Sequence, residues 1–439
     1  MQVLKFGGTS VGKPERMHQV AQLITKNDQP KIVVLSALAG TTNALVGIGE
    51  SLAGGKKQEA SEKINQLKAH YDGFIDALFS AEEKRAEARE IINEHFEFFH
   101  ITLKISFNEA LNRDILAQGE LMSTKLFTLY LEEQEIKTAL LPALEFMRTN
   151  EEAEPDIPFA ADKLTTLIRS HKGVNLFITQ GFICKNHKGE IDNLQRGGSD
   201  YTASLIGAAI KAEEVQIWTD IDGMHNNDPR VVDKTFPIAE LSFDEAAELA
   251  YFGAKILHPA SIWPAQKYGI PVKLLNTMQP EAKGTVISKQ TNSDDVKALA
   301  AKDGIIAVKI KSSRMLLAYG FLRKVFEIFE RYKTPIDMIT TSEVAVSVTI
   351  DDDTHLARIQ QELASLGKVE IDRNQTIICV VGNFVAEKKG IVNKIFESLQ
   401  DTPIRMISYG GSRHNISLLT DEAHKETALK KLNEHLFGL

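Results

Sequence analysis

The chain has 439 residues, which at roughly 150 residues per domain predicts about three domains. Its 43% hydrophobic and 25% charged residues are typical of a soluble globular protein. The net charge of −8 excludes a general attraction to nucleic acid or acidic membranes.

Two cysteines, Cys184 and Cys379, exclude a disulfide framework and a zinc site made of several cysteines. Each lies in an apolar run, so we expect both to be buried and unreactive. No apolar stretch approaches the roughly 20 residues of a membrane span, and the N-terminus has no signal-peptide layout. A cytoplasmic protein without a membrane partner is therefore expected.

Residues 1–290 alternate short apolar runs with helical patterns, which is typical of an α/β fold with a mainly parallel sheet. The expected strands are the runs 3–6, 31–38, 175–183, 215–221 and 271–276. Between about 56 and 135 the pattern is helical and charged, with little Gly or Pro. Residues 184–192 predict a β-hairpin, because a polar turn with a glycine separates two short extended runs.

An internal repeat follows a polar, linker-like segment at 290–297. The run that starts at Gly320, GFLRKVFE, recurs 70 residues later as GIVNKIFE from Gly390. Downstream, TPIDMI from Thr334 recurs 68 residues later as TPIRMI from Thr402. Each copy predicts a helix, a turn, a strand and a second, alternating strand, which indicates two small α+β units of similar build.

A glycine loop, KFGGTSVGK (5–13), follows the first predicted strand, and Pro14 marks the start of the next helix. Glycines let backbone N–H groups approach phosphate oxygens, and Lys5 could bring its ammonium to a transferring phosphate. The loop is not a P-loop, because Pro14 stands where the Mg²⁺-binding Ser or Thr is required. Taken alone, the two adjacent glycines would indicate only a tight turn.

A second loop, QRGGSDYTA (195–203), leads into an apolar helix. Ser199 or Asp200 could simply cap that helix. Capping does not account for Arg196 beside two glycines, since an Arg side chain offers a bidentate fork for a carboxylate or phosphate. An anion site with Asp200 nearby suits a zwitterionic amino acid.

Four further segments carry polar groups beside glycine or at a strand end. WTDIDGMHNNDPR (218–230) follows a strand, at the sheet edge where α/β folds bind ligands, and its acidic residues lack the EF-hand spacing. FGAKILHP contains Lys255, which alone would be interpreted as solvated surface. SALAGTTN (36–43) and GELMST (119–124) open helical sequence, and either could be simple capping.

Together these segments resemble the aspartokinases, members of the amino-acid kinase superfamily that carry paired ACT domains. The resemblance covers essentially the whole chain, since eight motifs occur in the expected order: KFGGTSV, VVLSALAGTTN, GELMST, RGGSDYTA, WTDIDGMHNNDPR, FGAKILHP, GFLRKVF and ITTSEV. It implies an α/β amino-acid kinase domain over 1–290, with a mainly parallel central sheet flanked by helices. Two α+β, ferredoxin-like ACT domains would follow at 303–370 and 374–439, with strands interleaved between them.

The resemblance implies transfer of the ATP γ-phosphoryl group to the β-carboxylate of L-aspartate, giving 4-phospho-L-aspartate, the first step toward lysine, threonine and methionine. A carboxylate is already ionised at pH 7, so the reaction needs no general base, and catalysis rests on positioning and charge stabilisation. ATP is then the co-substrate with Mg²⁺, which would be held through the phosphates with no direct side-chain ligand.

The resemblance also assigns site residues. The catalytic residues would be Lys5, Asp200 and Lys255. The aspartate site would comprise Ser36, Thr42, Glu120, Arg196, Gly197, Gly198, Ser199 and Asp200, with Arg196 on the substrate carboxylate and Glu120 facing its α-ammonium. The nucleotide site would comprise Lys5, Gly7, Gly8, Ser10, Thr219, Asp220, His225, Arg230, Lys255 and Ile256. Two positions depart from the family pattern: Gln195 replaces a Gly, and His225 replaces a Tyr.

In this family the ACT units bind a feedback amino acid at a dimer interface, so the resemblance implies a homodimer. The effector residues would be Met315, Ala318, Phe321, Leu322, Asp337, Ser342 and Glu343. This pattern matches the lysine-sensitive type except that Ala318 replaces a Ser, so lysine is favoured over threonine as the inhibitor. Phe321 and Leu322 fit equally well with simple packing of a helix on its sheet.

Two other functions remain as alternatives. One is a non-catalytic amino-acid sensor on a decayed kinase fold, which the presence of Lys5, Glu120, Arg196, Asp200 and Lys255 disfavours. The other is a different carboxylate kinase of the superfamily, which the ACT pair disfavours. A fusion with homoserine dehydrogenase is not expected, because the sequence ends with the second ACT unit and contains no dinucleotide fingerprint.

Overall fold

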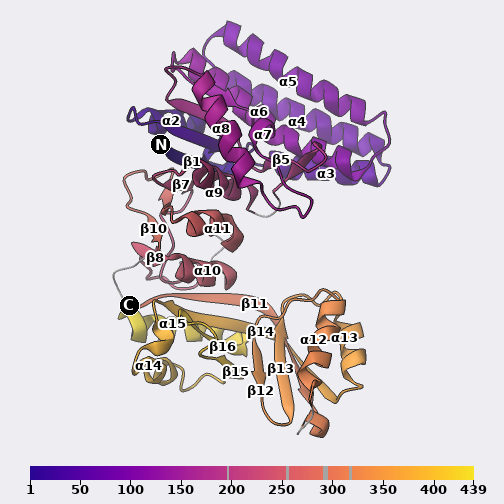
Figure 1. The fold of residues 1–439 in the computed structure, drawn as a ribbon, viewed down its shortest axis with the longest axis vertical. Coiled ribbons are helices and arrows are strands. Elements are labelled where there is room, and N and C mark those ends of the chain that lie inside the picture. Colours follow the sequence, from indigo (N-terminus) through magenta and orange to yellow (C-terminus); the bar gives the residue numbers. More distant parts are fainter. Residues whose placement is uncertain (195–196, 254–256, 290–294, 316–318) are drawn as a thin grey trace. The chain divides into compact units, whose positions relative to one another are not determined.

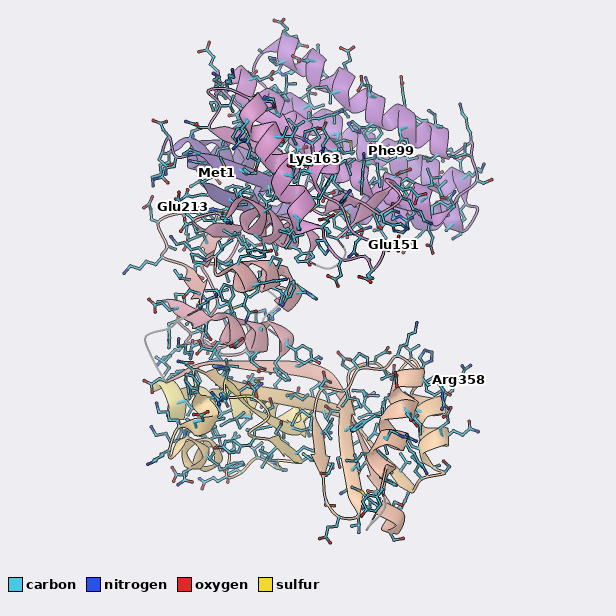
Figure 2. All side chains as sticks on the ribbon, viewed as in Figure 1. Met1, Phe99, Glu151, Lys163, Glu213 and Arg358 are labelled. Carbon is cyan, nitrogen blue, oxygen red and sulfur yellow. The ribbon has the colours of Figure 1, made fainter. Side chains whose placement is uncertain are left out.

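The computed structural model describes residues 1–194, 197–253, 257–289, 295–315 and 319–439, which form two compact units (Figure 1). The first unit comprises Met1–Met224, Ala239–Phe243 and Leu257–Gln290. The second unit comprises His225–Ile238, Asp244–Ile256 and Thr291–Leu439. Two segments that precede residue 290 in the sequence therefore group with the C-terminal part of the chain.

An eight-stranded sheet with the order β3-β4-β2-β1-β7-β9-β10-β8 forms the centre of the first unit. From β3 to β9 each strand is parallel to its neighbour, and only the β9–β10 pairing is antiparallel. The mainly parallel sheet predicted from the sequence is confirmed. The strands are β1 (Gln2–Phe6), β2 (Lys31–Leu35), β3 (Ala139–Leu141), β4 (Leu176–Gln180), β7 (Val215–Thr219), β8 (Glu240–Ser242), β9 (Val272–Asn276) and β10 (Thr285–Ser288).

Strand alternation places helices on both faces of this sheet. Leu4 and Phe6 of β1 join a core with apolar residues of α2 to α6, whereas Lys5 points to the other face and reaches α9. Figure 1 shows α4, α5 and α6 as long neighbouring helices. The helices of this unit are α1 (Gly8–Val11), α2 (Pro14–Thr25), α3 (Thr41–Ala53), α4 (Lys57–Leu78), α5 (Glu82–Thr102), α6 (Glu109–Glu133), α7 (Ala143–Phe146), α8 (Ile157–Ser170), α9 (Gly198–Ile210) and α11 (Pro259–Tyr268).

The predicted hairpin at 184–192 is confirmed as the antiparallel pair β5 (Ile183–Lys185) and β6 (Ile191–Asn193). The single strand expected over 175–183 is wrong, because β4 ends at Gln180 and β5 starts only at Ile183. Phe182 between them has a φ of 65°, a left-handed conformation that interrupts an extended strand.

The second unit is built on a six-stranded sheet with the order β12-β13-β11-β14-β16-β15. Two long antiparallel strands, β11 and β14, run through its centre. The strands are β11 (Val296–Lys311), β12 (Ile339–Thr341), β13 (Ala345–Ile350), β14 (Lys368–Gly382), β15 (Met406–Ser408) and β16 (Asn415–Asp421). The helices are α10 (Phe243–Tyr251, in this unit from Asp244), α12 (Phe321–Arg331), α13 (Leu356–Leu363), α14 (Ile391–Ser398) and α15 (Lys425–Phe437), with short 3₁₀ turns η1 (Ser313–Met315), η2 (Val385–Glu387) and η3 (Glu422–His424).

The sequence repeat corresponds to two matched halves of this unit. Both α12 and α14 begin after a glycine with a φ of 79°, at Gly320 and Gly390, and each is followed by two antiparallel strands and a helix. Each half has its own core, one with α12 and α13 and the other with α14 and α15. The first part of β11 contributes Leu299 to the second core, and its last part contributes Val308 to the first. The extents 303–370 and 374–439 stay a prediction, and the shared strand agrees with the expected interleaving of strands between the two halves.

Both cysteines are fully buried, as the sequence predicts. Burial raises the pKa of the Cys184 thiol to about 12, and it raises the pKa of Cys379 as well. Neither thiol is therefore a reactive nucleophile at neutral pH. Within the described ranges, no helix is both long and apolar enough to cross a membrane.

Candidate functional site

The glycine loop after β1 is pressed against the loop that follows β2. A Cβ on Gly8 would lie 3.1 Å from the Ala37 carbonyl oxygen, and one on Gly12 would lie 2.4 Å from the Ala39 Cβ. Side chains at these positions would force the two loops apart. The glycines thus have a packing reason in addition to the backbone access that the sequence suggested. Pro14 begins α2 at its first position, as predicted.

Lys5 and Asp200 form an ion pair, with 2.7 Å between Nζ and the carboxylate and side chains only 12% and 15% exposed. Strand alternation directs Lys5 toward α9, and Asp200 lies in the first turn of that helix. The helix begins after Gly197, whose φ is 70°, and no side chain caps it. The alternative in which Ser199 or Asp200 caps the helix is therefore wrong, and Asp200 is available to hold Lys5.

A cavity of about 450 Å³ lies in the first unit, and its lining includes Ser199, the residue before Asp200. Its lining joins the loop after β1, the loop after β2, α6, and the start of α9. The lining residues are Gly8, Thr9, Ser36, Ala37, Leu38, Ala39, Gly40, Thr42, Glu120, Phe182, Gly198 and Ser199. The fold thus brings together five of the residues predicted to bind aspartate: Ser36, Thr42, Glu120, Gly198 and Ser199. Their contacts with a substrate stay a prediction.

Among the described residues that line the cavity, Glu120 is the one with a carboxylate. Its side chain is buried, the Ala37 N–H donates to its Oε1 at 3.2 Å, and burial raises its pKa to about 7. A carboxyl group with a pKa near 7 is partly protonated at neutral pH. An incoming cation, such as a substrate ammonium, would favour its ionised form. The expectation that GELMST opens a helix is wrong, since Gly119 and Glu120 lie in the middle of α6. Gly119 is required there because a Cβ would lie 2.8 Å from that of Ala37.

Phe182 is a cavity residue that the sequence analysis did not identify. Its left-handed backbone is held by two hydrogen bonds: its N–H donates to Thr202 Oγ1 at 2.9 Å, and its carbonyl accepts from the Leu194 N–H at 2.8 Å. A Cβ on Gly198 would lie 2.4 Å from its ring. The glycine at 181, inside an otherwise apolar run, was the available signal for a strand break at this place.

The residues predicted for the nucleotide are distributed over both units. In the first unit, Ser10 is fully buried and its hydroxyl lies 2.8 Å from Thr277 Oγ1, and Thr219 at the end of β7 donates to Asp220 at 3.1 Å. In the second unit, His225 Nδ1 lies 2.9 Å from Thr235 Oγ1, and the exposed Arg230 pairs with Asp228 at 2.7 Å. Their roles stay predictions. Gln195, Arg196, Lys255 and Ile256 lie outside the described residues.

The predicted effector residues lie in the half of the second unit that contains α12. Phe321 belongs to the core of this half and Met315 packs against it, whereas Leu322 and the residues of the β12–β13 turn, Ser342 and Glu343, are exposed. Ala318 lies outside the described residues.

Asp337 lies before β12, at the opposite end of that strand from Ser342. Five residues of extended chain span roughly 16 Å. The two residues therefore lie at separate ends of β12, and a shared contact with one effector molecule stays a prediction.

Two family models match the chain. The amino acid kinase family matches residues 1–276, and an ACT domain model matches residues 378–436. Among curated proteins, the chain is 36% identical to lysine-sensitive aspartokinase 3 of Escherichia coli K12, over 99% of both chains. It is also 36% identical to the chloroplastic aspartokinase 3 of Arabidopsis thaliana, over 99% of this chain and 81% of that protein.

Solved structures give the same result over the full length. The structure of E. coli aspartokinase III in complex with aspartate and ADP (R-state) matches with a TM-score of 0.84 at 36% identity, over 100% of both chains. Aspartate kinase of Clostridium acetobutylicum matches with a TM-score of 0.83 at 25% identity, over 99% of this chain and 100% of that one. The chain therefore belongs to the amino acid kinase family and, within it, to the ACT-containing aspartokinases.

Proposed function

We propose that this protein transfers the γ-phosphoryl group of ATP to the β-carboxylate of L-aspartate, giving 4-phospho-L-aspartate and ADP. The observation that carries the proposal is the cavity lined by Glu120, Thr42 and Ser199 next to the Lys5–Asp200 pair. Its volume of about 450 Å³ suits a small amino acid. The E. coli relative that matches over its whole length binds aspartate and ADP.

The substrate is recognised by opposite charges at its two ends. Glu120 is a buried anion that an α-ammonium would neutralise, whereas Arg196, predicted from the sequence, would hold a carboxylate through its bidentate fork. Thr42 and Ser199 also line the cavity, and their hydroxyls would hydrogen-bond to the same molecule. A monocarboxylate without an ammonium would leave Glu120 without its partner.

The chemical step forms a bond between the β-carboxylate oxygen and the γ-phosphorus while the bond from that phosphorus to the β,γ-bridging oxygen breaks. The carboxylate is already ionised, so no residue has to remove a proton. Lys5 leaves part of its contact with Asp200 to stabilise the negative charge on the transferring group. Mg²⁺ bound to the ATP phosphates would supply further charge neutralisation.

Regulation is proposed to act through the ACT half that contains Asp337, with lysine favoured over threonine. The E. coli relative is named a lysine-sensitive enzyme, and it also has a solved structure in complex with lysine and aspartate. A homodimer with the effector site at its interface is proposed as well, on the resemblance to this family. A cytoplasmic location is proposed as well.

The test is an assay with ATP, Mg²⁺ and L-aspartate in which hydroxylamine traps the acyl phosphate as a hydroxamate. A hydroxamate signal with aspartate that is absent with glutamate or acetate is expected. Signal with glutamate or acetate but none with aspartate would overturn the proposal in favour of another carboxylate kinase. Titrating lysine and threonine into the same assay identifies the inhibitor, and light scattering of the full chain measures the oligomeric state.

A further inference from the structure

The effector residue Asp337 is engaged by two residues that the sequence analysis did not assign to any site. Its Oδ1 lies 2.8 Å from the Lys302 ammonium of β11 and accepts a hydrogen bond of 2.8 Å from the Tyr251 hydroxyl at the end of α10. Lys302 also pairs with Asp351 at 2.9 Å and lies 4.6 Å from the centre of the Tyr251 ring. These four side chains form what we call the Asp337 cluster.

The Asp337 cluster is short of one positive charge. Asp337 and Asp351 carry two negative charges, and Lys302 supplies one positive charge. The Asp337 side chain is only 1% exposed, yet its Oδ2 has no hydrogen-bond partner within the described part of the chain. A buried carboxylate oxygen without a donor is costly. The cluster is therefore able to accept a further ammonium group on Asp337.

Helix α10 is fixed to the rest of the second unit at several points that do not involve the effector residues. Glu245 of α10 pairs with Lys297 of β11 at 3.4 Å, with both side chains buried, and Glu248 accepts a hydrogen bond from Asn415 of β16. The bond to Asp337 comes instead from Tyr251, the last residue of the helix. Contacts with β11 and β16 therefore hold the middle of the helix, whereas its last residue, Tyr251, is bonded to Asp337.

The chain beyond this end also packs closely on β11. Gly253 has a φ of 129°, and a Cβ there would lie 2.3 Å from the carbonyl oxygen of Ala301, the neighbour of Lys302. Lys255, predicted from the sequence to act in phosphoryl transfer, is four residues after Tyr251. A change at Tyr251 is therefore close in sequence to a predicted catalytic residue.

We propose that the Tyr251–Asp337 hydrogen bond couples effector binding to helix α10, and that Lys302 holds Asp337 for this bond while no effector is present. The effector's ammonium binds the unpartnered Oδ2 of Asp337 and draws the carboxylate away from Tyr251 and Lys302, which both contact Oδ1. Loss of the Tyr251 bond releases the end of α10, while Glu245 and Glu248 keep its body in place. Tyr251 is a positioning residue in this scheme. The inference rests on the proposed regulation by lysine through Asp337.

The test is Tyr251→Phe in the full-length protein, which removes one hydroxyl and keeps the aromatic ring over Lys302. Lysine inhibition of the hydroxamate assay and lysine binding by calorimetry are measured separately. Because the variant lacks the bond whose loss transmits the signal, we expect kcat without lysine to fall toward the value of the lysine-inhibited wild type. Further inhibition by lysine should weaken at least about fivefold, the lower end of usual allosteric couplings. The dissociation constant for lysine should stay within about twofold or decrease.

A matched control is Tyr268→Phe, since Tyr251 and Tyr268 are both 44% exposed and Tyr268 lies at the end of α11. The control should behave as wild type. Unchanged inhibition in Tyr251→Phe would overturn the coupling, and so would a parallel loss of binding and inhibition, which would make Tyr251 only a support for the site. A wild-type protein that neither binds lysine nor responds to it would instead overturn the proposed regulation, and the inference with it.

Discussion

Each unit of this protein contains a lysine–aspartate pair of nearly the same length, but the two pairs differ in charge balance. Lys5 and Asp200 lie 2.7 Å apart and carry one charge of each sign. Lys302 and Asp337 lie 2.8 Å apart, and Asp351 adds a second carboxylate. The first pair is balanced until an anion such as a phosphate arrives, whereas the second is already short of a cation.

This difference in charge balance indicates which residue of each ion pair would bind the ligand. In the first unit the proposed ligand, a phosphate, is anionic, so the lysine would be the binding group and the aspartate would hold it in position. In the second unit the proposed ligand is cationic, so Asp337 is the proposed binding group. The Lys302 ammonium contacts this carboxylate while the ligand is absent. Similar ion pairs can thus have opposite functions, and the surrounding charges decide which.

The largest effect is expected for Lys5→Met, which removes the cation from the first pair. We expect kcat to fall about 10³-fold, because the transferring phosphoryl group loses a lysine proposed to stabilise its charge. The hydroxamate assay measures the loss, and circular dichroism checks the fold. The control is Lys13→Met, an exposed lysine at the end of the same loop, which should keep wild-type activity. A large loss in Lys13→Met would instead favour a P-loop-like role for that residue.

The next largest effect is expected for Glu120, a buried carboxylate that forms no ion pair among the described residues. In Glu120→Gln we expect the KM for aspartate to rise about 10- to 100-fold, the value of a hydrogen bond to a charged group. Because burial raises the Glu120 pKa to about 7, the wild-type KM should fall as the pH rises through 7, and the variant should lack this dependence. The control is Glu109→Gln at the exposed start of α6. An unchanged KM in Glu120→Gln would remove the ammonium contact from the proposal.

Glu120→Gln should also change the free energy of unfolding, and the raised pKa of Glu120 determines the sign of this change. The folded-state pKa of Glu120 lies above its ordinary value of 4.5, so ionisation opposes folding once the pH rises through about 7. Glu120→Gln should therefore be more stable than wild type at pH 8, on the order of 3 kcal/mol, and no more stable at pH 4. Urea unfolding at the two pH values measures the difference. Equal stability at pH 8 would mean that Glu120 does not carry a buried charge.

The smallest effect is expected for Lys302→Met, and its sign is opposite to that of Lys5→Met. Without the resident ammonium, two carboxylates remain for the effector, so the dissociation constant for lysine should fall about threefold to tenfold. Calorimetry with lysine measures it. Lys311→Met removes an exposed ion pair with Glu370 from the same strand and is the control. Weaker lysine binding in Lys302→Met would contradict the view that this lysine competes with the effector.

Much of the fold could be predicted because backbone preferences are local. Apolar runs identified the parallel strands β1, β2, β4, β7 and β9 but missed the short strands β3, β8 and β10, and the hairpin followed from one glycine turn. The repeat identified Gly320 and Gly390, which adopt the same left-handed conformation before matching helices. The failures also have local causes: Gly181 and Phe182 interrupt a run that looked like one strand, and Gly119 lies inside a long helix because it packs against Ala37.

The sequence by itself determined the fold class, the order of the motifs and the residues able to bind anions or ammonium groups. The tertiary structure decided which of these residues meet. It joins Ala37 to Glu120 across 83 residues and Tyr251 to Asp337 across 86. The pKa of a carboxylate and the partner of a lysine depend on burial and on nearby charges. Those come from packing between distant segments, which a local pattern does not encode.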